Sequence, residues 1–454
     1  MIYDLAVLGG GPGGYTAADA AAKAGLSVVL FEKDLLGGTC LNRGCIPTKA
    51  LLHGSELFRA AKSGQDWGMN AESLSCDFAA LQSKKNALVA TLRQGVERLM
   101  KSDKVTVVGQ KATVLSVTDQ GVTLQARDET YEAKELIVAA GSVPAVPPIP
   151  GADLPGIVTS NGILEGGGLA LSSLAIIGGG VIGCEIASVY ANLGAQVTIL
   201  EAADRLLPTM DKEIGQRLAL CFKKQGIAVS VACRVTEIEE AADGLTVAYT
   251  DKAGKACAVT AQGVLIATGR RAAAEGLFTG EAPDMERGAI LADEAGRTSL
   301  PHVYVIGDAK AGTLQLAHLA EAQARNAVAA IRGLPLPVDT GTVPACVYTQ
   351  PEIASVGLTE EAARAAGRAV KAKKIPSGAN GKCVIESSDP GFVKVLTDAD
   401  SGVVLGAQLV CPRATELVAE FALAISLGLK AEQVASVIHP HPTVSEIIAE
   451  ACRD

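Results

Sequence analysis

An internal duplication of a glycine-rich segment limits the possible folds of this chain more than any other feature. Residues 5–14 read LAVLGGGPGG, and residues 174–183 read LAIIGGGVIG, 169 positions further on. In each copy an apolar run leads into a glycine turn, which is typical of a buried parallel strand followed by a helix. The chain is therefore expected to contain two copies of one strand–turn–helix–strand unit.

Each copy matches the pattern G-x-G-x-x-G of a dinucleotide-binding turn. The first glycine permits a tight turn, the second lets the backbone approach a pyrophosphate, and the third lets helix and strand pack closely. One such pattern alone is weak evidence, but two copies in register predict two nucleotide sites. The predicted cofactor-binding glycines are Gly9, Gly11 and Gly14 in the first copy and Gly178, Gly180 and Gly183 in the second.

An acidic residue ends the second strand of each unit. Glu32 lies 18 positions after Gly14, and Glu201 lies 18 positions after Gly183. A carboxylate there can accept hydrogen bonds from both ribose hydroxyls of a nucleotide. At Glu201 it would also repel the 2′-phosphate of NADP, for which an arginine is expected. The second site is therefore predicted to bind NAD.

Three further apolar runs end in residues suited to a cofactor. The runs LIVAAG and VLIATG, which end at Gly141 and Gly269, repeat one unit, and each is expected to be the last strand of a nucleotide-binding domain. The run VYVIGD places Asp308 just past a strand, where its carboxylate can hold a ribityl or ribose hydroxyl.

Composition argues against several other classes of protein. Hydrophobic residues make up 48% of the 454 residues and charged residues only 20%, which excludes a disordered chain. Residues 166–184 carry no charge, but their glycines and serines fit a strand and a turn better than a membrane helix. The net charge of −9 and the lack of a long basic run argue against nucleic acid binding. We expect neither a membrane nor a nucleic acid as a partner.

Eleven cysteines, an odd number, point to a reducing compartment. The strand-like residues 3–8 follow Met1 directly and leave no room for a signal peptide. The expected location is the cytoplasm, with most cysteines as small core residues.

Cys40 and Cys45 lie in a glycine-rich segment directly after the first ribose acid. Zinc sites prefer C-x2-C pairs, of which the chain has none, so no metal is expected. Inert burial and a purely structural disulfide compete with a redox-active pair, but the glycine flanks and the reducing compartment disfavour them. Pro47 in a first helical turn would place Cys45 near a helix N-terminus, where that position and Lys49 favour the reactive thiolate.

The segment GGTCLNRGCIPTKALL (residues 37–52), together with both glycine motifs, resembles the flavoprotein disulfide reductases. The resemblance continues in residues 201–208, 347–352 and 439–446 and covers essentially the whole chain. It implies an α/β fold with two Rossmann-like dinucleotide-binding domains, the first for FAD and the second for NAD. A C-terminal α+β dimerisation domain would form a homodimer and complete the active site in trans.

The implied domains are not consecutive, because the FAD domain is split around the NAD domain. The boundaries are 1–143 for the first part of the FAD domain, 144–268 for the NAD domain, 269–338 for the second, central part of the FAD domain, and 339–454 for the dimerisation domain.

The resemblance also assigns roles around the flavin. Cys40 would exchange with the substrate and Cys45 would lie against the flavin. Lys49 would lie near the flavin and pair with Glu185, whose alternative role is to complement the dipole of its own helix. Ala317 and His318 would lie on a helix beside the flavin.

His441 is the catalytic base that the resemblance implies, with Glu446 to orient it. Imidazole titrates near neutral pH, and a carboxylate on its other ring nitrogen fixes the tautomer. Glu446 has an alternative, because Thr443 and Glu446 match the pattern of a helix capping box.

The implied activity is oxidation of protein-bound dihydrolipoamide to lipoamide with NAD⁺ as hydride acceptor, through a Cys40–Cys45 redox disulfide. The lipoyl carrier would be a separate protein, either the E2 subunit of a 2-oxoacid dehydrogenase complex or the glycine cleavage H protein. Glutathione-type reductases are disfavoured by Glu201 and soluble transhydrogenases by the presence of Cys40. Mercuric reductases are disfavoured by the single C-terminal cysteine, Cys452. A non-catalytic flavin-binding sensor would need neither the thiol pair nor His441.

Overall fold

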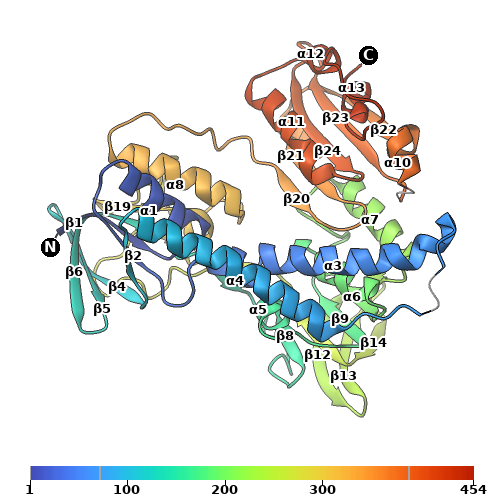
Figure 1. Ribbon diagram of the computed structural model, residues 1–454, viewed down its shortest axis with the longest axis horizontal. Coiled ribbons are helices and arrows are strands. Elements are labelled where there is room, and N and C mark those ends of the chain that lie inside the picture. The colour runs from blue at the N-terminus through green and yellow to red at the C-terminus, as the bar shows by residue number, and fades with distance from the viewer. Residues whose placement is uncertain (1, 71–72, 387–388, 454) are drawn as a thin grey trace.

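Two mainly parallel sheets each contain one copy of the duplicated segment, the first at the left of the molecule and the second at its lower right (Figure 1). The computed structural model describes residues 2–70, 73–386 and 389–453. Each duplicated strand is buried and continues into a glycine turn and a helix, as the sequence predicts. The strands are β1 (Ile2–Leu8) and β9 (Ser173–Ile177), and the helices are α1 (Pro12–Lys23) and α6 (Val181–Asn192).

The first sheet has the order β3-β2-β1-β6-β5-β4, and β19 pairs with β6. Strand β19 pairs with β6 in parallel although it follows the whole second sheet in the chain. The first unit is therefore formed by two separate stretches of the sequence. The strands are β2 (Val28–Phe31), β3 (Thr106–Val108), β4 (Ala112–Thr118), β5 (Gly121–Ala126), β6 (Glu129–Val138) and β19 (Val303–Val305).

The second sheet has the order β11-β10-β9-β15-β8, and all of its pairs are parallel. A three-stranded antiparallel sheet with the order β12-β13-β14 follows β11 in the chain. The strands are β8 (Ile157–Thr159), β10 (Gln196–Leu200), β11 (Ala228–Ser230), β12 (Arg234–Ala241), β13 (Gly244–Thr250), β14 (Ala256–Ala261) and β15 (Gly263–Ile266).

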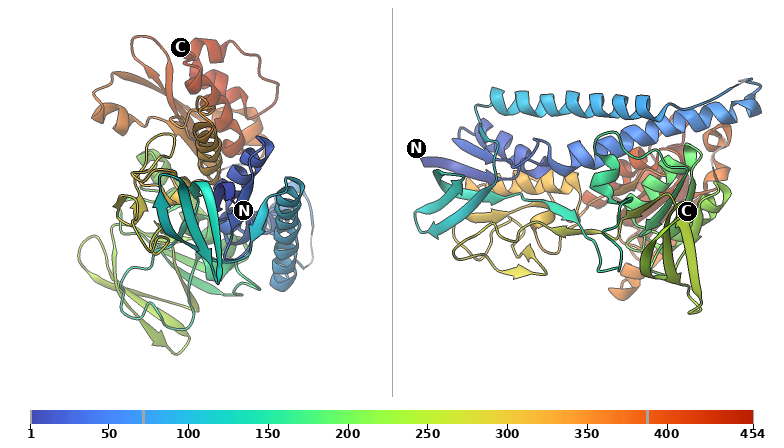
Figure 2. Two further views of the ribbon diagram at one scale, coloured as in Figure 1. Left: turned by 90° about the vertical axis from the view of Figure 1, so that its left-hand side faces the viewer. Right: turned by 90° about the horizontal axis from the view of Figure 1, so that it is seen from below.

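Helices cover the first sheet and extend from it. Helix α8 (Ala317–Ile331) packs against α1. Helices α3 (Cys45–Ser63) and α4 (Phe78–Ser102) pack against each other, offset along the long axis, and together extend over most of it (Figure 2). Among the described residues, no helix combines the length and the hydropathy that a membrane span requires.

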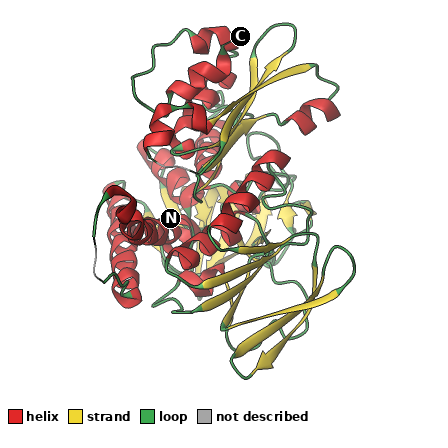
Figure 3. Cartoon of the chain, turned by 90° about the vertical axis from the view of Figure 1, so that its right-hand side faces the viewer, coloured by secondary structure: helices red, strands yellow, loops and turns green. Residues whose placement is uncertain are grey.

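The C-terminal part is an antiparallel sheet with helices, in the order β20-β21-β24-β23-β22 (Figure 3). Its elements are β20 (Ala345–Val347), β21 (Ile353–Gly357), β22 (Val370–Pro376), β23 (Phe392–Asp398), β24 (Val404–Val410), α11 (Ala414–Ser426) and α13 (Glu446–Cys452). Parallel sheets in the first two units and this α+β unit confirm the predicted fold class.

Candidate active site

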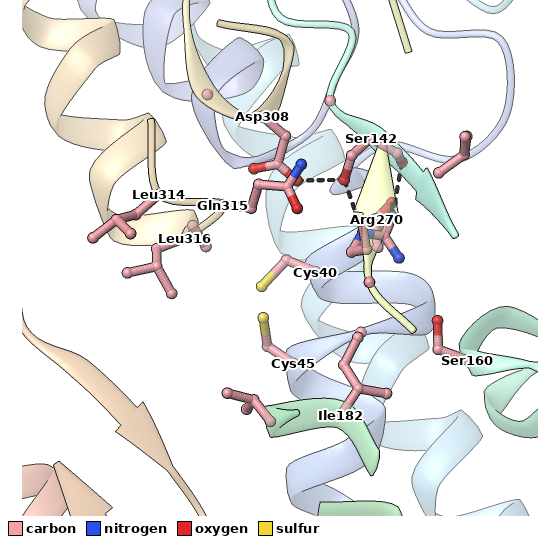
Figure 4. Close-up of a pocket in the computed structure, with 18 of the residues that line it drawn as sticks. Cys40, Cys45, Ser142, Ser160, Ile182, Arg270, Asp308, Leu314, Gln315 and Leu316 are labelled. Carbon is pink, nitrogen blue, oxygen red and sulfur yellow. Dashed lines mark hydrogen bonds between the residues drawn. The ribbon is translucent and has the colours of Figure 1, made fainter. Parts of the chain in front are cut away.

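The two thiols face each other across a break between two helices. Helix α2 (Gly38–Arg43) carries Cys40, and Cys45 is the first residue of α3. Gly44 separates them, and a Cβ there would lie 2.9 Å from the carbonyl oxygen of Thr39, so only glycine lets the helices approach this closely. The sulfur atoms point toward one another in the cavity (Figure 4).

The surroundings of the thiols favour a negative charge on Cys45. The pKa of Cys45 is lowered to about 7 because its sulfur accepts a hydrogen bond from the Cys40 thiol and lies near the Lys49 ammonium. The same hydrogen bond, together with burial, raises the pKa of Cys40 well above its usual range. Cys45 is therefore the thiolate of the reduced pair, and the helix N-terminus is where a thiolate is favoured.

Lys49 and Glu185 form the ion pair that the resemblance implies. The Lys49 Nζ lies 2.9 and 2.8 Å from the two carboxylate oxygens of Glu185. The first turn of α6 contains no acidic residue, so the geometry gives no support to a helix-dipole role for Glu185. The backbone N–H of Tyr348 also donates to Glu185, and the Lys49 Nζ lies 4.5 Å from the centre of the Tyr348 ring.

The two glycine turns have nearly identical geometry. Gly9 and Gly178 have φ angles of 105° and 112°, in the left-handed region that favours glycine. A Cβ at Gly14 would lie 1.8 Å from the carbonyl oxygen of Gly9, and one at Gly183 would lie 2.0 Å from that of Gly178. The third glycine of each turn is therefore required for the helix to pack on its strand.

The same turns fit dinucleotides. The space beside the second glycine of each turn is open. A Cβ at Gly11 would come no closer than 3.9 Å to another residue, and a Cβ at Gly180 would meet no atom within 4 Å, so a ligand can approach the backbone at both positions. Gly11 and Gly180 are also the N-cap residues of α1 and α6, and no side chain caps either helix. Apart from Pro12, which has no N–H group, the first backbone N–H groups of both helices are thus available to phosphate oxygens.

Glu32 and Glu201, the two acidic residues predicted to bind ribose hydroxyls, occupy equivalent positions in the two units. The Glu32 carboxylate accepts hydrogen bonds from the backbone N–H groups of Gly10 and Asp34. The Glu201 carboxylate accepts them from Gly179 and Ala203. The backbone therefore fixes each carboxylate at the end of its strand, beside its glycine turn.

One continuous cavity of about 1700 Å³ joins these groups. Most of the predicted site residues line it. They are Gly9, Gly11, Glu32, Cys40, Cys45, Lys49, Gly141, Gly178, Gly180, Glu185, Glu201, Gly269, Asp308, Ala317 and His318. Among the residues that the structure describes, no cluster of three or more potential ligands could hold a metal ion.

Three further predicted cofactor residues, Asp308, Ala317 and His318, have the following contacts. Asp308 lies in a short turn after β19 and accepts a hydrogen bond from the Ser142 hydroxyl at 2.5 Å. Ala317 is the first residue of α8, and the His318 Nε2 lies 2.8 Å from the carbonyl oxygen of Pro344. This bond ties the start of α8 to the segment that leads into β20.

His441 and Glu446 form a pair at the other end of the chain. The His441 Nδ1 lies 2.8 Å from Oε1 of Glu446, while Oε2 of Glu446 accepts the backbone N–H of Thr443. The capping box predicted from the sequence does not form, because α13 begins at Glu446 itself after Ser445, and the Thr443 hydroxyl donates to the carbonyl oxygen of Pro440. The bonds to the Thr443 N–H, first, and to His441 lower the pKa of Glu446. The His441 side chain is 80% exposed and does not line the cavity that contains the thiols.

Sequence reasoning missed three residues of the site. Tyr348 lies within the segment 347–352 that carries the resemblance, but no spacing connects it with Lys49. Ser142 and Arg270 directly follow the predicted strand-end glycines, and nothing in the sequence indicates that they contact one another.

A disulfide oxidoreductase with two dinucleotide sites is the class that this fold and site define. Residues 3–324 match the pyridine nucleotide-disulphide oxidoreductase family, and residues 343–452 match the dimerisation domain of that family. The chain therefore belongs to the pyridine nucleotide-disulphide oxidoreductases and is an oxidoreductase that uses FAD and NAD. The dimerisation domain supports a homodimer.

Similar curated proteins within this family are dihydrolipoyl dehydrogenases. The chain is 40% identical to that of Geobacillus stearothermophilus, over 98% of this chain and 94% of the relative. It is 38% identical to dihydrolipoyl dehydrogenase 3 of Pseudomonas putida, over 99% of this chain and 97% of the relative.

Solved structures agree in fold. LpdA from Mycobacterium tuberculosis has a TM-score of 0.89 and 26% identity, with 99% of this chain and 98% of that chain covered. An HOCl-induced flavoprotein disulfide reductase from Escherichia coli has a TM-score of 0.86 and 28% identity, with 99% of each chain covered.

Proposed function

We propose that this protein is a dihydrolipoyl dehydrogenase, which oxidises protein-bound dihydrolipoamide to lipoamide with NAD⁺ as electron acceptor. The observation that carries the proposal is the facing pair Cys40 and Cys45, placed in one cavity with two dinucleotide cradles. Relatives of that name, similar over nearly the whole chain, support it.

The first step transfers the substrate's electrons to the thiol pair. His441 of the partner subunit accepts a proton from one substrate thiol, and the resulting thiolate attacks Sγ of Cys40 in the Cys40–Cys45 disulfide. The disulfide breaks and Cys45 leaves as the thiolate. The second substrate thiol then displaces Cys40 from the mixed disulfide, which forms lipoamide and leaves both cysteines reduced.

The residues of the two cradles would hold the cofactors. Gly9, Gly11, Gly14, Glu32 and Asp308 would hold FAD, whereas the second glycine turn and Glu201 would hold NAD. When bound, FAD and NAD supply the hydride chemistry that removes the two electrons from the thiol pair. Lys49, fixed by Glu185, places a positive charge beside the thiolate throughout.

The proposal includes a partner, a location and a domain division. The partner is a lipoyl-bearing carrier, namely an E2 subunit of a 2-oxoacid dehydrogenase complex or the glycine cleavage H protein. The location is the cytoplasm, where the cysteines outside the active pair remain reduced. The domain division is 1–143 and 269–338 for FAD, 144–268 for NAD and 339–454 for dimerisation, which agrees with the return of β19 to the first sheet.

An anaerobic assay of the holoenzyme tests this function. The flavin spectrum is followed while dihydrolipoamide is added and then NAD⁺, with NADP⁺ in a parallel reaction. In the reverse arm, NADH is supplied with lipoamide, oxidised glutathione or Hg(II). We expect turnover with the lipoyl substrate and NAD⁺. Faster reduction of glutathione or Hg(II), or equal use of NADP⁺, would contradict the assignment.

A further inference from the structure

Arg270 and Ser142 join the two chain segments that connect the dinucleotide units. Ser142 begins β7 (Ser142–Pro144), directly after Gly141, and Arg270 begins β16 (Arg270–Ala272), directly after Gly269. The two short strands pair antiparallel, with Arg270 opposite Pro144. The contacts of Arg270 therefore lie where the chain leaves the first unit and where it returns.

The Arg270 guanidinium makes a fork of hydrogen bonds toward the flavin side of the cavity. Its Nε donates to the Ser142 hydroxyl at 2.8 Å, and its Nη2 donates to the Ser142 carbonyl oxygen at 2.7 Å. The Ser142 hydroxyl in turn donates to Asp308 (Figure 4). The Nη2 also lies 3.5 Å from the hydroxyl of Thr39, the residue before Cys40.

The charge of Arg270 reaches the thiol pair. Burial lowers the pKa of Arg270, whereas the negative charges of Asp308 and Cys45 raise it. An arginine with an ordinary pKa above 12 stays protonated under these opposing effects. Arg270 is therefore a half-buried cation within electrostatic range of Cys45.

Other charged groups also act on Cys45. The pKa of Cys45 is affected by the Cys40 thiol, the Lys49 ammonium and the Glu185 carboxylate. The hydroxyl of Tyr15 also lies within range of both thiols. Because both oxygens of Glu185 bind Lys49, that carboxylate offsets much of the lysine's charge at the sulfur. Arg270 donates to the neutral Ser142, and the Asp308 carboxylate beyond it acts on Arg270 more strongly than Cys45 does.

We propose that Arg270 is a positioning residue of the redox centre. Arg270 holds Ser142 and Asp308 against helix α2, which carries Cys40, and stabilises the Cys45 thiolate. The proposal rests on the proposed function, because it concerns the same thiol pair. Neighbouring Arg271 offers a matched control, since its side chain is 61% exposed and its ion pair within the described part of the chain is with the exposed Glu275.

The test is a thiol titration that does not depend on turnover. Holoenzyme carrying Cys40→Ser retains Cys45 as the sole thiol of the pair, with a hydroxyl in place of the neighbouring donor. The rate at which iodoacetamide alkylates Cys45 is measured against pH by mass spectrometry of the peptide. In this Cys40→Ser background, we expect Arg270→Met to raise the midpoint of the curve of alkylation rate against pH by about one pH unit, because a nearby cation is lost.

Two further variants separate the charge of Arg270 from its fork. Arg270→Lys should restore most of the shift in midpoint, since it keeps the charge. The visible spectrum of bound FAD should change in both Arg270 variants, because neither can hold both groups of Ser142. Arg271→Met should match the parent in both measurements.

An unchanged midpoint in Arg270→Met with FAD bound would overturn the electrostatic role, and an unchanged flavin spectrum in Arg270→Lys would overturn the positioning role. If Arg270→Met does not fold, Arg270→Gln supplies the uncharged variant and the same expectations apply. Failure of the proposed function is recognised separately, as oxidised wild-type holoenzyme without a Cys40–Cys45 disulfide by mass spectrometry.

Discussion

Cys40 and Cys45 carry different chemistry although both are half-buried cysteines of one short segment. In thiol–disulfide exchange the sulfur with the lower pKa is the better leaving group. The pKa of Cys45 is lowered and that of Cys40 is raised. Attack at the Cys40 sulfur therefore expels Cys45 as a stabilised thiolate, whereas attack at Cys45 would expel an unstabilised one. The local electrostatics thus support the proposal that Cys40 meets the substrate.

Cys45→Ser should abolish oxidation of dihydrolipoamide and leave FAD bound, because serine cannot form the disulfide but fills nearly the same volume. Turnover is measured by NADH formation and FAD content by absorbance. Cys257→Ser, in β14, serves as the control and should keep wild-type turnover. Substantial oxidation of dihydrolipoamide by Cys45→Ser would exclude the thiol pair as the route of the electrons.

The low pKa of Cys45 also predicts how the stability of the reduced protein depends on pH. The folded pKa of about 7 lies below the ordinary value of 9.0, so between these values the unfolded chain binds more protons. The free energy of unfolding therefore rises with pH in this window and loses this contribution as the pH falls through 7. Urea unfolding of reduced wild type and Cys45→Ser at several pH values measures the difference, which should grow from pH 7 to 9. A constant difference would show that the charge on Cys45 adds nothing to folding.

Glu446→Gln separates the two contacts of Glu446. Glutamine keeps an oxygen that can accept the N–H of Thr443 but loses the charge that stabilises a protonated His441. We expect kcat to fall by roughly tenfold or more, with little change in melting temperature. Glu450→Gln, an exposed position of the same helix α13, is the control. A lower melting temperature with unchanged kcat would instead assign Glu446 to the helix terminus alone.

At the scale of elements, each nucleotide-binding unit is formed by a helix that packs unusually closely on its strand. Helices α1 and α6 approach β1 and β9 so closely that the third glycine of each turn has no room for a side chain. Their uncapped N-termini then direct unpaired backbone N–H groups at the cavity. Close packing and anion binding are therefore two results of one backbone geometry.

Gly14→Ala should prevent FAD binding and lower the melting temperature, because its Cβ would lie 1.8 Å from the carbonyl oxygen of Gly9. Gly183→Ala meets the corresponding contact in the second unit and should weaken NAD binding while FAD stays bound. Gly95→Ala in α4 is the control, since its Cβ would meet no atom within 4 Å. It should stabilise the protein by about 0.5–1 kcal/mol, the usual gain inside a helix. Normal FAD content in Gly14→Ala would show that the helix can move away from its strand.

At the scale of the whole molecule, the sequence predicts what lies within one unit better than what lies between units. The glycine turns and ribose acids follow from short-range spacing, and the structure forms both as expected. Lys49 and Glu185 are 136 positions apart, so their pairing follows from the resemblance and not from any periodicity. The contact of Arg270 with Ser142 depends on the pairing of two three-residue strands, which carries no signal in the sequence.

The position of His441 makes the dimer part of the catalytic argument. Its side chain is 80% exposed in the single chain and lies outside the cavity of the thiols, so one chain does not bring the proposed base to the thiols. The dimerisation domain that carries His441 offers the arrangement in which each base serves the thiols of the other copy. In that arrangement two inactive variants can complement one another.

His441→Gln alone should lower turnover by about 10²-fold or more, the usual contribution of a general base. Cys45→Ser alone should show no turnover. A heterodimer of these two variants, isolated with two different affinity tags, contains one site in which both lesions meet. Its other site combines the intact thiols of one copy with the intact His441 of the other. If the site forms in trans, the heterodimer should recover about half of the wild-type turnover per dimer, because one of two sites is complete. If base and thiols came from the same chain, both sites would carry a lesion and the heterodimer would stay as inactive as its parents.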